Sequence, residues 1–117
     1  MRWFILALLL ACAHSEPKLP PPETDEQRDA AEELQKQHEY FEEFMTSARQ
    51  DCSKRCAMAH AVCEKSRRVC SIAEQSPKQE DALTPYCAVA QGRCDKVDKR
   101  LRGDIFCRCW STGPRVD

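Results

Sequence analysis

The sequence predicts an all-α fold: a long first helix and a shorter antiparallel second helix, stapled by disulfides into a helical hairpin, with a short folded-back tail. The spacing Cys-x6-Cys occurs twice, as Cys63 with Cys70 and as Cys87 with Cys94, on either side of a serine–proline break. Cysteines seven apart on one helix lie about 10.5 Å apart, so they cannot bond to each other. In two antiparallel helices the pairs Cys70–Cys87 and Cys63–Cys94 face one another in register, because their residue numbers have the same sum. We therefore predict these two disulfides.

Composition and charge limit what the chain can be. It has 117 residues, nine of them cysteine, which suits one small domain held by cross-links more than by apolar burial. Residues 25–50 contain eight acids and three bases, a net −5, and residues 51–117 contain nine acids and thirteen bases, a net +4. A dispersed charge of this size does not indicate nucleic-acid binding, and we expect no nucleic-acid partner.

The N-terminus predicts export and a lipid anchor. Arg2 precedes an apolar run over residues 3–13, which is short of the ~20 residues of a membrane-spanning helix and therefore indicates a secretion signal. The run contains Leu-Leu-Ala-Cys ending at Cys12, which resembles the lipobox of bacterial lipoproteins. The resemblance implies cleavage before Cys12 and acyl chains on its thiol and amine, which together form a stable membrane anchor. Ala13 follows in place of Asp, which implies the outer membrane, with the body facing the periplasm, under the sorting rule of enteric lipoproteins.

The odd number of cysteines agrees with an exported, lipidated protein. Assigning Cys12 to lipid leaves eight cysteines, an even number that suits disulfides in an oxidising compartment. We divide the chain into a cleaved signal peptide (1–11), a lipidated cysteine with a Pro-rich linker (12–23), the acidic start of the first helix (24–50) and the Cys-rich hairpin with its tail (51–117). The prolines keep the linker extended, and we expect it to hold the body away from the membrane.

The first helix is predicted from its cap and its periodicity. Thr24 and Gln27 have the spacing of a capping box, and residues 25–75 include neither Gly nor Pro. Apolar residues and cysteines recur there at steps of three and four, so the simpler expectation is one helix of about 50 residues, ~75 Å long. Two helices with a kink near residues 46–51 are the alternative.

The second helix is predicted from proline and glycine positions. We expect a polar loop over residues 76–83, followed by a helix with Thr84 as its N-cap and Pro85 in its first position. This helix should end at Arg102, with Gly103 as the stop.

The tail carries Cys107 and Cys109, and we expect it to fold back near Cys52 and Cys56. The choice of pairing among these four cysteines is open from spacing alone. Our prediction is Cys56–Cys107 with Cys52–Cys109, because this continues the antiparallel order of the hairpin. Each bridge would stabilise the fold by about 2–4 kcal/mol by restricting the unfolded chain.

Two other uses of the cysteines are alternatives. Cys52 and Cys56 share a helix face, with Met58 and His60 nearby, a set that could hold a soft ion such as Cu(I). The Cys-x-Cys pair of the tail could act as a redox couple. The spacing Cys-x2-Cys of zinc ribbons and thioredoxins is absent from the sequence, and compartment and parity favour disulfides. We therefore predict no metal and no cofactor.

No residue is predicted to be catalytic. Ser53, Ser66 and Ser71 lack a matching His and Asp arrangement, and three glycines do not build a phosphate loop. We expect a protein that is not an enzyme.

An apolar cluster stands out in the acidic part of the first helix. Its members are Tyr40, Phe41, Phe44 and Met45. We expect this cluster to pack on the tail, and the alternative is a surface for a protein partner or for self-association.

The body also carries the pattern Asp-Cys-x3-Cys, then Cys-x6-Cys-x-Ile-Ala, then Cys-x2-Ala-x2-Arg-Cys and a closing cysteine pair. In this it resembles small cysteine-rich lipoproteins of myxobacteria and related groups. The matching residues are Asp51, Cys52, Cys56, Cys63, Cys70, Ile72, Ala73, Cys87, Ala90, Arg93 and Cys94. The resemblance implies fold and location but no activity. We expect a membrane-anchored envelope module with a structural or protein-interaction role, with copper binding and thiol–disulfide exchange as the alternatives.

Overall fold

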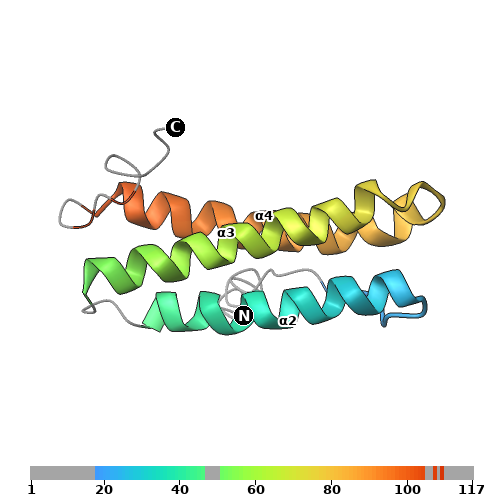
Figure 1. Ribbon diagram of the computed structural model, residues 1–117, viewed down its shortest axis with the longest axis horizontal. Helices are drawn as coiled ribbons and strands as arrows, with labels where there is room; N and C mark the ends of the chain where they lie inside the picture. The colour runs from blue at the N-terminus through green and yellow to red at the C-terminus, as the bar shows by residue number, and fades with distance from the viewer. Residues whose placement is uncertain (1–17, 47–50, 105–106, 108, 110–117) are drawn as a thin grey trace, which may run out of the picture.

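The computed structural model describes residues 18–46, 51–104, 107 and 109. This part of the chain contains three long helices, one short 3-10 helix and no strand (Figure 1). In chain order the elements are α2 (Asp25–Thr46), α3 (Cys52–Glu74), η1 (Pro77–Gln79) and α4 (Glu80–Arg102). Because disulfides also cross between elements, the predicted all-α, disulfide-stapled fold class is confirmed. None of the described helices has the length and apolar character needed to cross a membrane.

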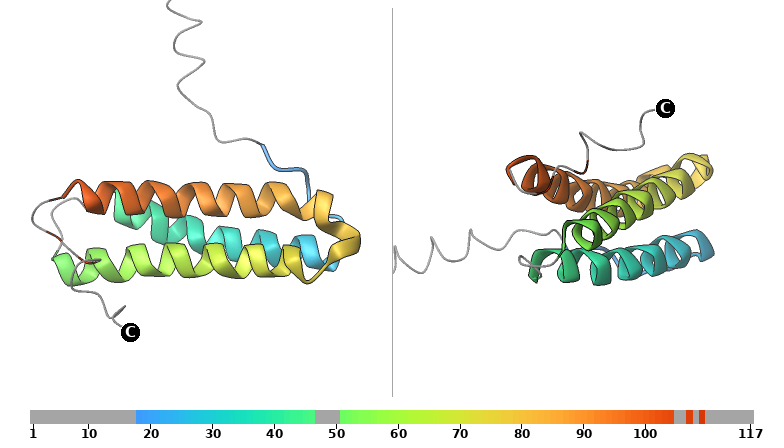
Figure 2. Two further views of the ribbon diagram at one scale, coloured as in Figure 1. Left: turned by 90° about the horizontal axis from the view of Figure 1, so that it is seen from above. Right: turned by 60° about the vertical axis from the view of Figure 1, so that its left-hand side comes forward.

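The helix α3 is antiparallel to both of its neighbours, so the chain runs up, down and up again (Figure 1). The helices α3 and α4 form the predicted hairpin, which is closed by η1. The helix α2 lies along this hairpin and contacts α3 more extensively than α4 (Figure 2). The result is a three-helix bundle in which α2 and α4 contact each other less extensively than either contacts α3.

The first helical stretch is two helices, so the prediction of one continuous helix is wrong. The helix α2 ends at Thr46 and α3 begins at Cys52, within the range given for the alternative kink. Ala30, Leu34 and Phe44 of α2 are at most 5% exposed because α2 folds back onto the hairpin. In a continuous helix these side chains would stay in water, and burying a Leu or Phe is worth roughly 1.5–3 kcal/mol. The three-and-four periodicity is the same in either arrangement and cannot separate them.

The ends of the helices mostly follow local capping rules. At the start of α2, Gln27 N donates to Thr24 Oγ1 at 3.2 Å and Thr24 N donates to Gln27 Oε1 at 3.1 Å, which is the predicted capping box. Asp51 caps α3 by accepting a hydrogen bond from Ser53 N. At the other end, α4 stops before Gly103, as predicted.

The start of α4 differs from the prediction. The helix begins at Glu80, so the expected loop over residues 76–83 and the N-cap at Thr84 are wrong. Leu83 is fully buried in the core, so the additional helical turn places apolar surface out of water. Pro85 therefore lies inside α4, in its second turn, and not in the first helical position as predicted, and it lacks the N–H for one helical hydrogen bond.

The core has two apolar clusters at opposite ends of the bundle. One joins the start of α2 to the α3–α4 turn, and the other joins the end of α2 to the start of α3 and the end of α4. The first cluster consists of Ala30, Leu34, Val69, Ala73, Leu83, Tyr86, Val89 and Ala90. The second consists of Phe44, Met58, Ala59, Val62, Val97, Leu101 and Cys107.

A buried glutamine on α2 binds the backbone of both other helices. Gln37 is 0% exposed, and its Nε2 donates to Val62 O of α3 and to Ala90 O of α4, each at 2.9 Å. Its Oε1 accepts from Arg93 Nη1 at 3.4 Å, and the same Nη1 donates to Leu34 O at 3.0 Å. Because the hydrogen bonds of a buried polar group require one geometry, Gln37 fixes the register of α2 on the hairpin.

We predict that Gln37→Ala lowers the free energy of unfolding by about 1–3 kcal/mol, because it removes two buried hydrogen bonds and leaves a gap. Urea unfolding of the oxidised protein measures this loss. Gln91→Ala, at an exposed position of α4, is the matched control. If the two variants were equally stable, the role assigned to Gln37 would be wrong.

Candidate functional site

The hairpin disulfides form as predicted. Cys63–Cys94 and Cys70–Cys87 join α3 to α4, with Cα atoms 4.7 Å and 4.6 Å apart. These distances are typical of disulfides and show that both cysteine pairs face each other across the helix interface. The repeated seven-residue spacing therefore sets the register of the hairpin.

The tail disulfides join Cys52 and Cys56 to Cys107 and Cys109, as predicted, but each of the two helix cysteines bonds to the other tail cysteine. The structure has Cys52–Cys107 and Cys56–Cys109, so the predicted pairing Cys56–Cys107 with Cys52–Cys109 is wrong. The first tail cysteine bonds to the first of the two α3 cysteines and the second to the second. The tail therefore runs parallel to α3 where it is bonded to it. The prediction extended the direction of α4 beyond its end, whereas the chain has to turn back to lie on α3.

The aromatic cluster is divided between core and surface. Phe44 is 0% exposed in the second core cluster, so it is not available to a partner as one alternative supposed. Phe41 and Met45 pack partly buried against the same cluster, which includes Cys107 of the tail. These three residues therefore pack in the bundle at the end that also holds Cys107 of the tail. Tyr40 alone is well exposed, at 40%.

A buried arginine completes the packing around Phe44. The guanidinium carbon of Arg55 lies 4.5 Å from the centre of the Phe44 ring, and Arg55 Nη1 donates to Phe44 O at 3.4 Å. Arg55 is only 4% exposed. A cation over an aromatic face is attracted by the negative π surface, so this pair ties the end of α2 to the start of α3. Nothing in the sequence pattern distinguishes Arg55 from the surface bases.

The geometry does not assemble the copper or redox sites that were the alternatives. The sulfurs of Cys52 and Cys56 are each in a disulfide, Met58 is buried, and His60 is exposed. The tail cysteines bond to α3 and not to each other. Among the described residues there is no group of three or more His, Cys, Asp or Glu side chains placed to hold a metal ion.

The Pro-rich segment before α2 is docked on the bundle, so the expected spacer role is wrong for its described residues. Leu19 packs against the first core cluster, and the Tyr86 hydroxyl donates to Pro20 O at 2.7 Å. Burial raises the pKa of the Tyr86 phenol, and the Glu23 carboxylate raises it further. The hydroxyl therefore stays protonated and able to donate throughout the neutral range. The prolines do keep the segment non-helical, as expected.

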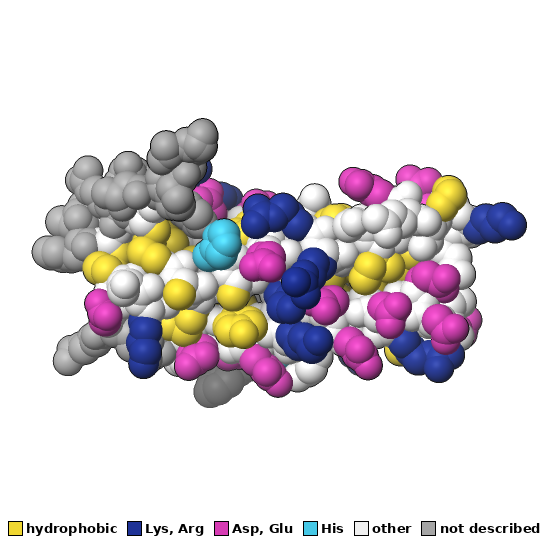
Figure 3. Space-filling view, viewed as in Figure 1, with side chains coloured by type: hydrophobic (Ala, Val, Ile, Leu, Met, Phe, Trp, Pro, Cys, Tyr) yellow, Lys and Arg dark blue, Asp and Glu magenta, His cyan; other side chains and the backbone are white. Residues whose placement is uncertain are grey.

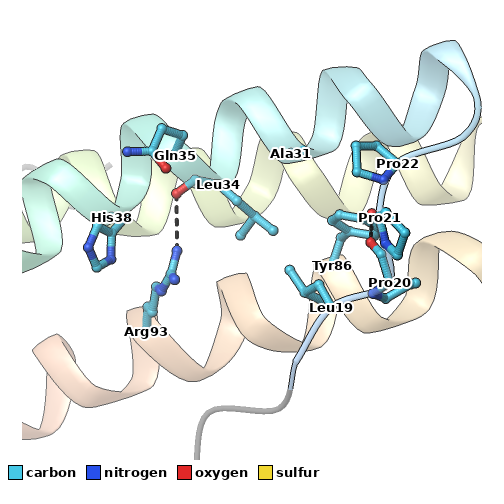
Figure 4. Close-up of a pocket in the computed structure, with 10 residues that line it drawn as sticks. All are labelled: Leu19, Pro20, Pro21, Pro22, Ala31, Leu34, Gln35, His38, Tyr86 and Arg93. Atoms are coloured by element: carbon cyan, nitrogen blue, oxygen red, sulfur yellow. Dashed lines mark hydrogen bonds between the residues drawn. The ribbon is translucent and has the colours of Figure 1, made fainter.

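The docked segment borders a pocket of about 440 Å³ between α2 and α4. Figure 4 shows Leu19 and the prolines beside Tyr86 at one end, and Arg93 reaching from α4 to the α2 backbone near the other. Leu34 lies between the two ends and His38 lies beyond Arg93. The pocket is thus apolar where the segment is docked and polar where Arg93 crosses it.

Charged side chains are distributed unevenly over the bundle. Glu33 pairs with Lys65 of α3 at 3.1 Å and with Arg68 at 4.0 Å, which places the Glu33 side of α2 toward α3. Partial burial raises the pKa of the Glu33 carboxyl, but the positive charges of Lys65, Lys36 and Arg68 lower it by more, so the pKa of Glu33 is below its usual value.

Figure 3 shows acidic side chains along much of the α2 edge of this face.

Further acids are exposed along α2. They are Asp25, Asp29, Glu32, Glu39, Glu42 and Glu43. With Glu26 and Glu33, α2 carries eight acids against two bases, so it is the acidic element of the bundle.

Two sequence predictions lie outside the described residues, namely the signal peptide over residues 1–11 and the acylated Cys12, as does the whole of the tail after Cys109. Comparison of the chain with protein-family models, curated proteins and solved structures finds no match. The assignment of a function therefore depends on the residues themselves.

The order of the tail disulfides can be tested by tryptic mapping without reduction. Lys54 and Arg55 lie between Cys52 and Cys56, and Arg108 lies between Cys107 and Cys109, so trypsin places these four cysteines in different peptides. We predict that the peptide of residues 50–54 is bonded to the peptide of residues 103–108. Mass spectrometry of the unreduced digest identifies the linked pair.

The same digest contains its own control and its own contradiction. The Cys63–Cys94 bond links residues 56–65 to residues 94–96 under either tail pairing, so it reports that disulfides survived the digestion. A bond between residues 50–54 and residues 109–115 would show that the tail runs in the other direction.

Proposed function

We propose that this protein is an envelope lipoprotein, anchored through acyl chains on Cys12, whose stapled three-helix bundle is a non-enzymatic interaction module. The observation that carries the proposal is the use of the cysteines. Eight of the nine are bonded in four disulfides, and Cys12 is the ninth. It lies in the Leu-Leu-Ala-Cys sequence directly behind an apolar run, which is where a lipobox cysteine is expected.

The disulfides also support the compartment. Four bonds in a small bundle suit an oxidising space such as the periplasm and are rare in a reducing cytoplasm. The lipobox resemblance and Ala13 favour the outer membrane, with the bundle facing the periplasm. The likeness to small cysteine-rich lipoproteins of myxobacteria agrees with this place and adds no activity.

An interaction role is supported by the exposed surface of α2. The disulfides stabilise the hairpin, each by about 2–4 kcal/mol, and Gln37 hydrogen-bonds α2 to both helices of that hairpin. Tyr40 is exposed on α2 and is bordered by Glu39 and Glu43, which are also exposed. An aromatic side chain among acids is suited to a basic partner, because the ring supplies contact area and the carboxylates supply charge complementarity. We therefore propose a basic envelope protein as the partner.

A photo-crosslinking residue placed at Tyr40 tests the anchored interaction in cells. We expect a discrete crosslinked product from the Tyr40 position and none from Gln91, an exposed position on α4 that serves as the control. The product should weaken when the neighbouring carboxylates are removed by Glu39→Gln with Glu43→Gln. Equal products from both positions would contradict a specific surface on α2.

The Cys12→Ser variant adds the test of anchoring to the same experiment. Without the thiol no acyl chain can be attached, so the variant should leave the membrane fraction and lose the crosslink. Ala13→Ser keeps the cysteine and is the matched control. A Cys12→Ser protein that stays with the membrane and keeps the crosslink would overturn the lipoprotein assignment.

A further inference from the structure

We propose that the face of the bundle formed by α2 and α4 lies against the membrane, and that Lys96 and Arg100 of α4 meet anionic phospholipid headgroups there. This inference rests on the proposed anchoring through Cys12. It adds an orientation and a lipid preference that anchoring alone does not require.

The first argument is the length of chain between the lipid and the docked segment. Only five residues lie between Cys12 and Lys18, and the six Cα–Cα steps from one to the other span ~20 Å at most in a fully extended chain. Leu19 and Pro20 are held on the bundle by the apolar core and by the Tyr86 hydroxyl. The membrane must therefore lie within this short distance of the α2/α4 face.

The opposite orientation does not fit the same tether. A helix with its side chains is roughly 10–12 Å thick, and the bundle is two helix layers deep measured from the docked segment to the outer side of α3 (Figure 2). If α3 faced the membrane, the chain from Cys12 to Lys18 would have to pass around the bundle, and its full length would be needed for that. The acyl chains could then not reach the hydrocarbon.

The second argument is the row of bases that shares the face of the docked segment. Tyr86, Arg93 and Arg100 are seven residues apart, which places them on one side of α4. Two contacts show that this is the side toward α2: Arg93 Nη1 donates to Leu34 O, and Arg100 Nη1 lies 3.3 Å from Met45 Sδ. Lys96, one turn before Arg100, extends the row.

Lys96 and Arg100 are exposed, and neither makes an ion pair within residues 18–46 and 51–104. On the α2 side, Ala31 and Gln35 line the pocket without charge. Two acids do lie near this face: Glu42 Oε1 is 3.9 Å from His38 Nε2, and the Glu23 carboxylate is close enough to act on the Tyr86 phenol.

The remaining charge of α2 is directed elsewhere. Glu33 faces Lys65 of α3. Glu32, Lys36, Glu39 and Glu43 recur at steps of three and four on another side of α2, and none of them lines the pocket beside the docked segment. A bilayer with anionic headgroups attracts nearby lysine and arginine and repels acids, so this distribution matches one face of the bundle to the membrane.

Lysine footprinting of the lipidated protein tests the orientation. The protein is reconstituted in phosphatidylcholine vesicles with or without phosphatidylglycerol, and its acetylation by a water-soluble reagent is compared with that in detergent. We expect the acetylation rates of Lys96 and Lys18 to fall severalfold in vesicles with phosphatidylglycerol. Lys36 and Lys54, which lie on the side of α2 and α3, should react as they do in detergent.

A pair of charge-reversal variants separates headgroup contact from simple proximity. Lys96→Glu with Arg100→Glu should abolish the dependence of Lys18 protection on phosphatidylglycerol. Arg67→Glu with Lys78→Glu, two exposed bases outside the row, should leave it unchanged. Protection that is equal in both kinds of vesicle would overturn the headgroup contact, and protection of Lys36 or Lys54 in place of Lys96 would overturn the orientation.

Failure of the anchor itself would appear separately. Intact mass of the reconstituted protein shows whether acyl chains are present before the footprint is read. An unlipidated protein would overturn the proposed function, whereas a lipidated protein with an unprotected Lys96 would overturn only this inference.

Discussion

The bonds that hold α3 to α4 and to the tail are the constraint on which the other features depend. The four disulfides span sequence separations of 17, 31, 53 and 55 residues, so each closes a long loop in the unfolded chain. Closing long loops removes more unfolded-state entropy than closing short ones, at about 2–4 kcal/mol for a typical bond. A body with few large apolar side chains gains from these bonds a stability that burial alone would not give it.

The helix α2 contains no cysteine and is held by packing and hydrogen bonds. Phe44 and Leu34 enter the two apolar clusters, and Gln37 between them binds backbone oxygens of both other helices. The Arg55 guanidinium stacks on the Phe44 ring and so ties the end of α2 to the start of α3. The acidic surface of α2 is therefore presented by a helix whose position depends on non-covalent contacts with a covalently fixed hairpin. Local opening of the bundle should begin at α2, because it is the element that no cross-link retains.

Much of this architecture could be predicted from the sequence, and the misses have a common cause. The register of Cys63–Cys94 and Cys70–Cys87 follows from helical period alone, and the Thr24–Gln27 capping box follows from local spacing. The break after Thr46 could not be predicted, because a helix that folds back has the same period as one that continues. The predictions that failed all concern how separate segments meet in space.

The same cause explains the errors at the candidate surfaces. Phe41 and Phe44 differ by three residues on one apolar stripe, and the packing of α2 on the hairpin, including the Arg55 guanidinium over the ring, decides that Phe44 is the fully buried one. The docking of Pro20 depends on Tyr86, a residue 66 positions away whose hydroxyl no periodicity would single out. The tail order depends on a change of chain direction between Gly103 and Cys107. In each case a tertiary contact decides what local pattern leaves open.

The proposed anchor and the disulfides make one claim about the nine cysteines: eight hold the body and Cys12 holds the membrane. Intact mass spectrometry of the detergent-extracted protein, treated with a thiol-alkylating reagent before and after reduction, tests it most directly. The account predicts a chain that starts at Cys12 with a lipid adduct, takes up no reagent before reduction and takes up eight equivalents afterwards. A chain that begins at Met1, or one that is alkylated before reduction, would contradict it.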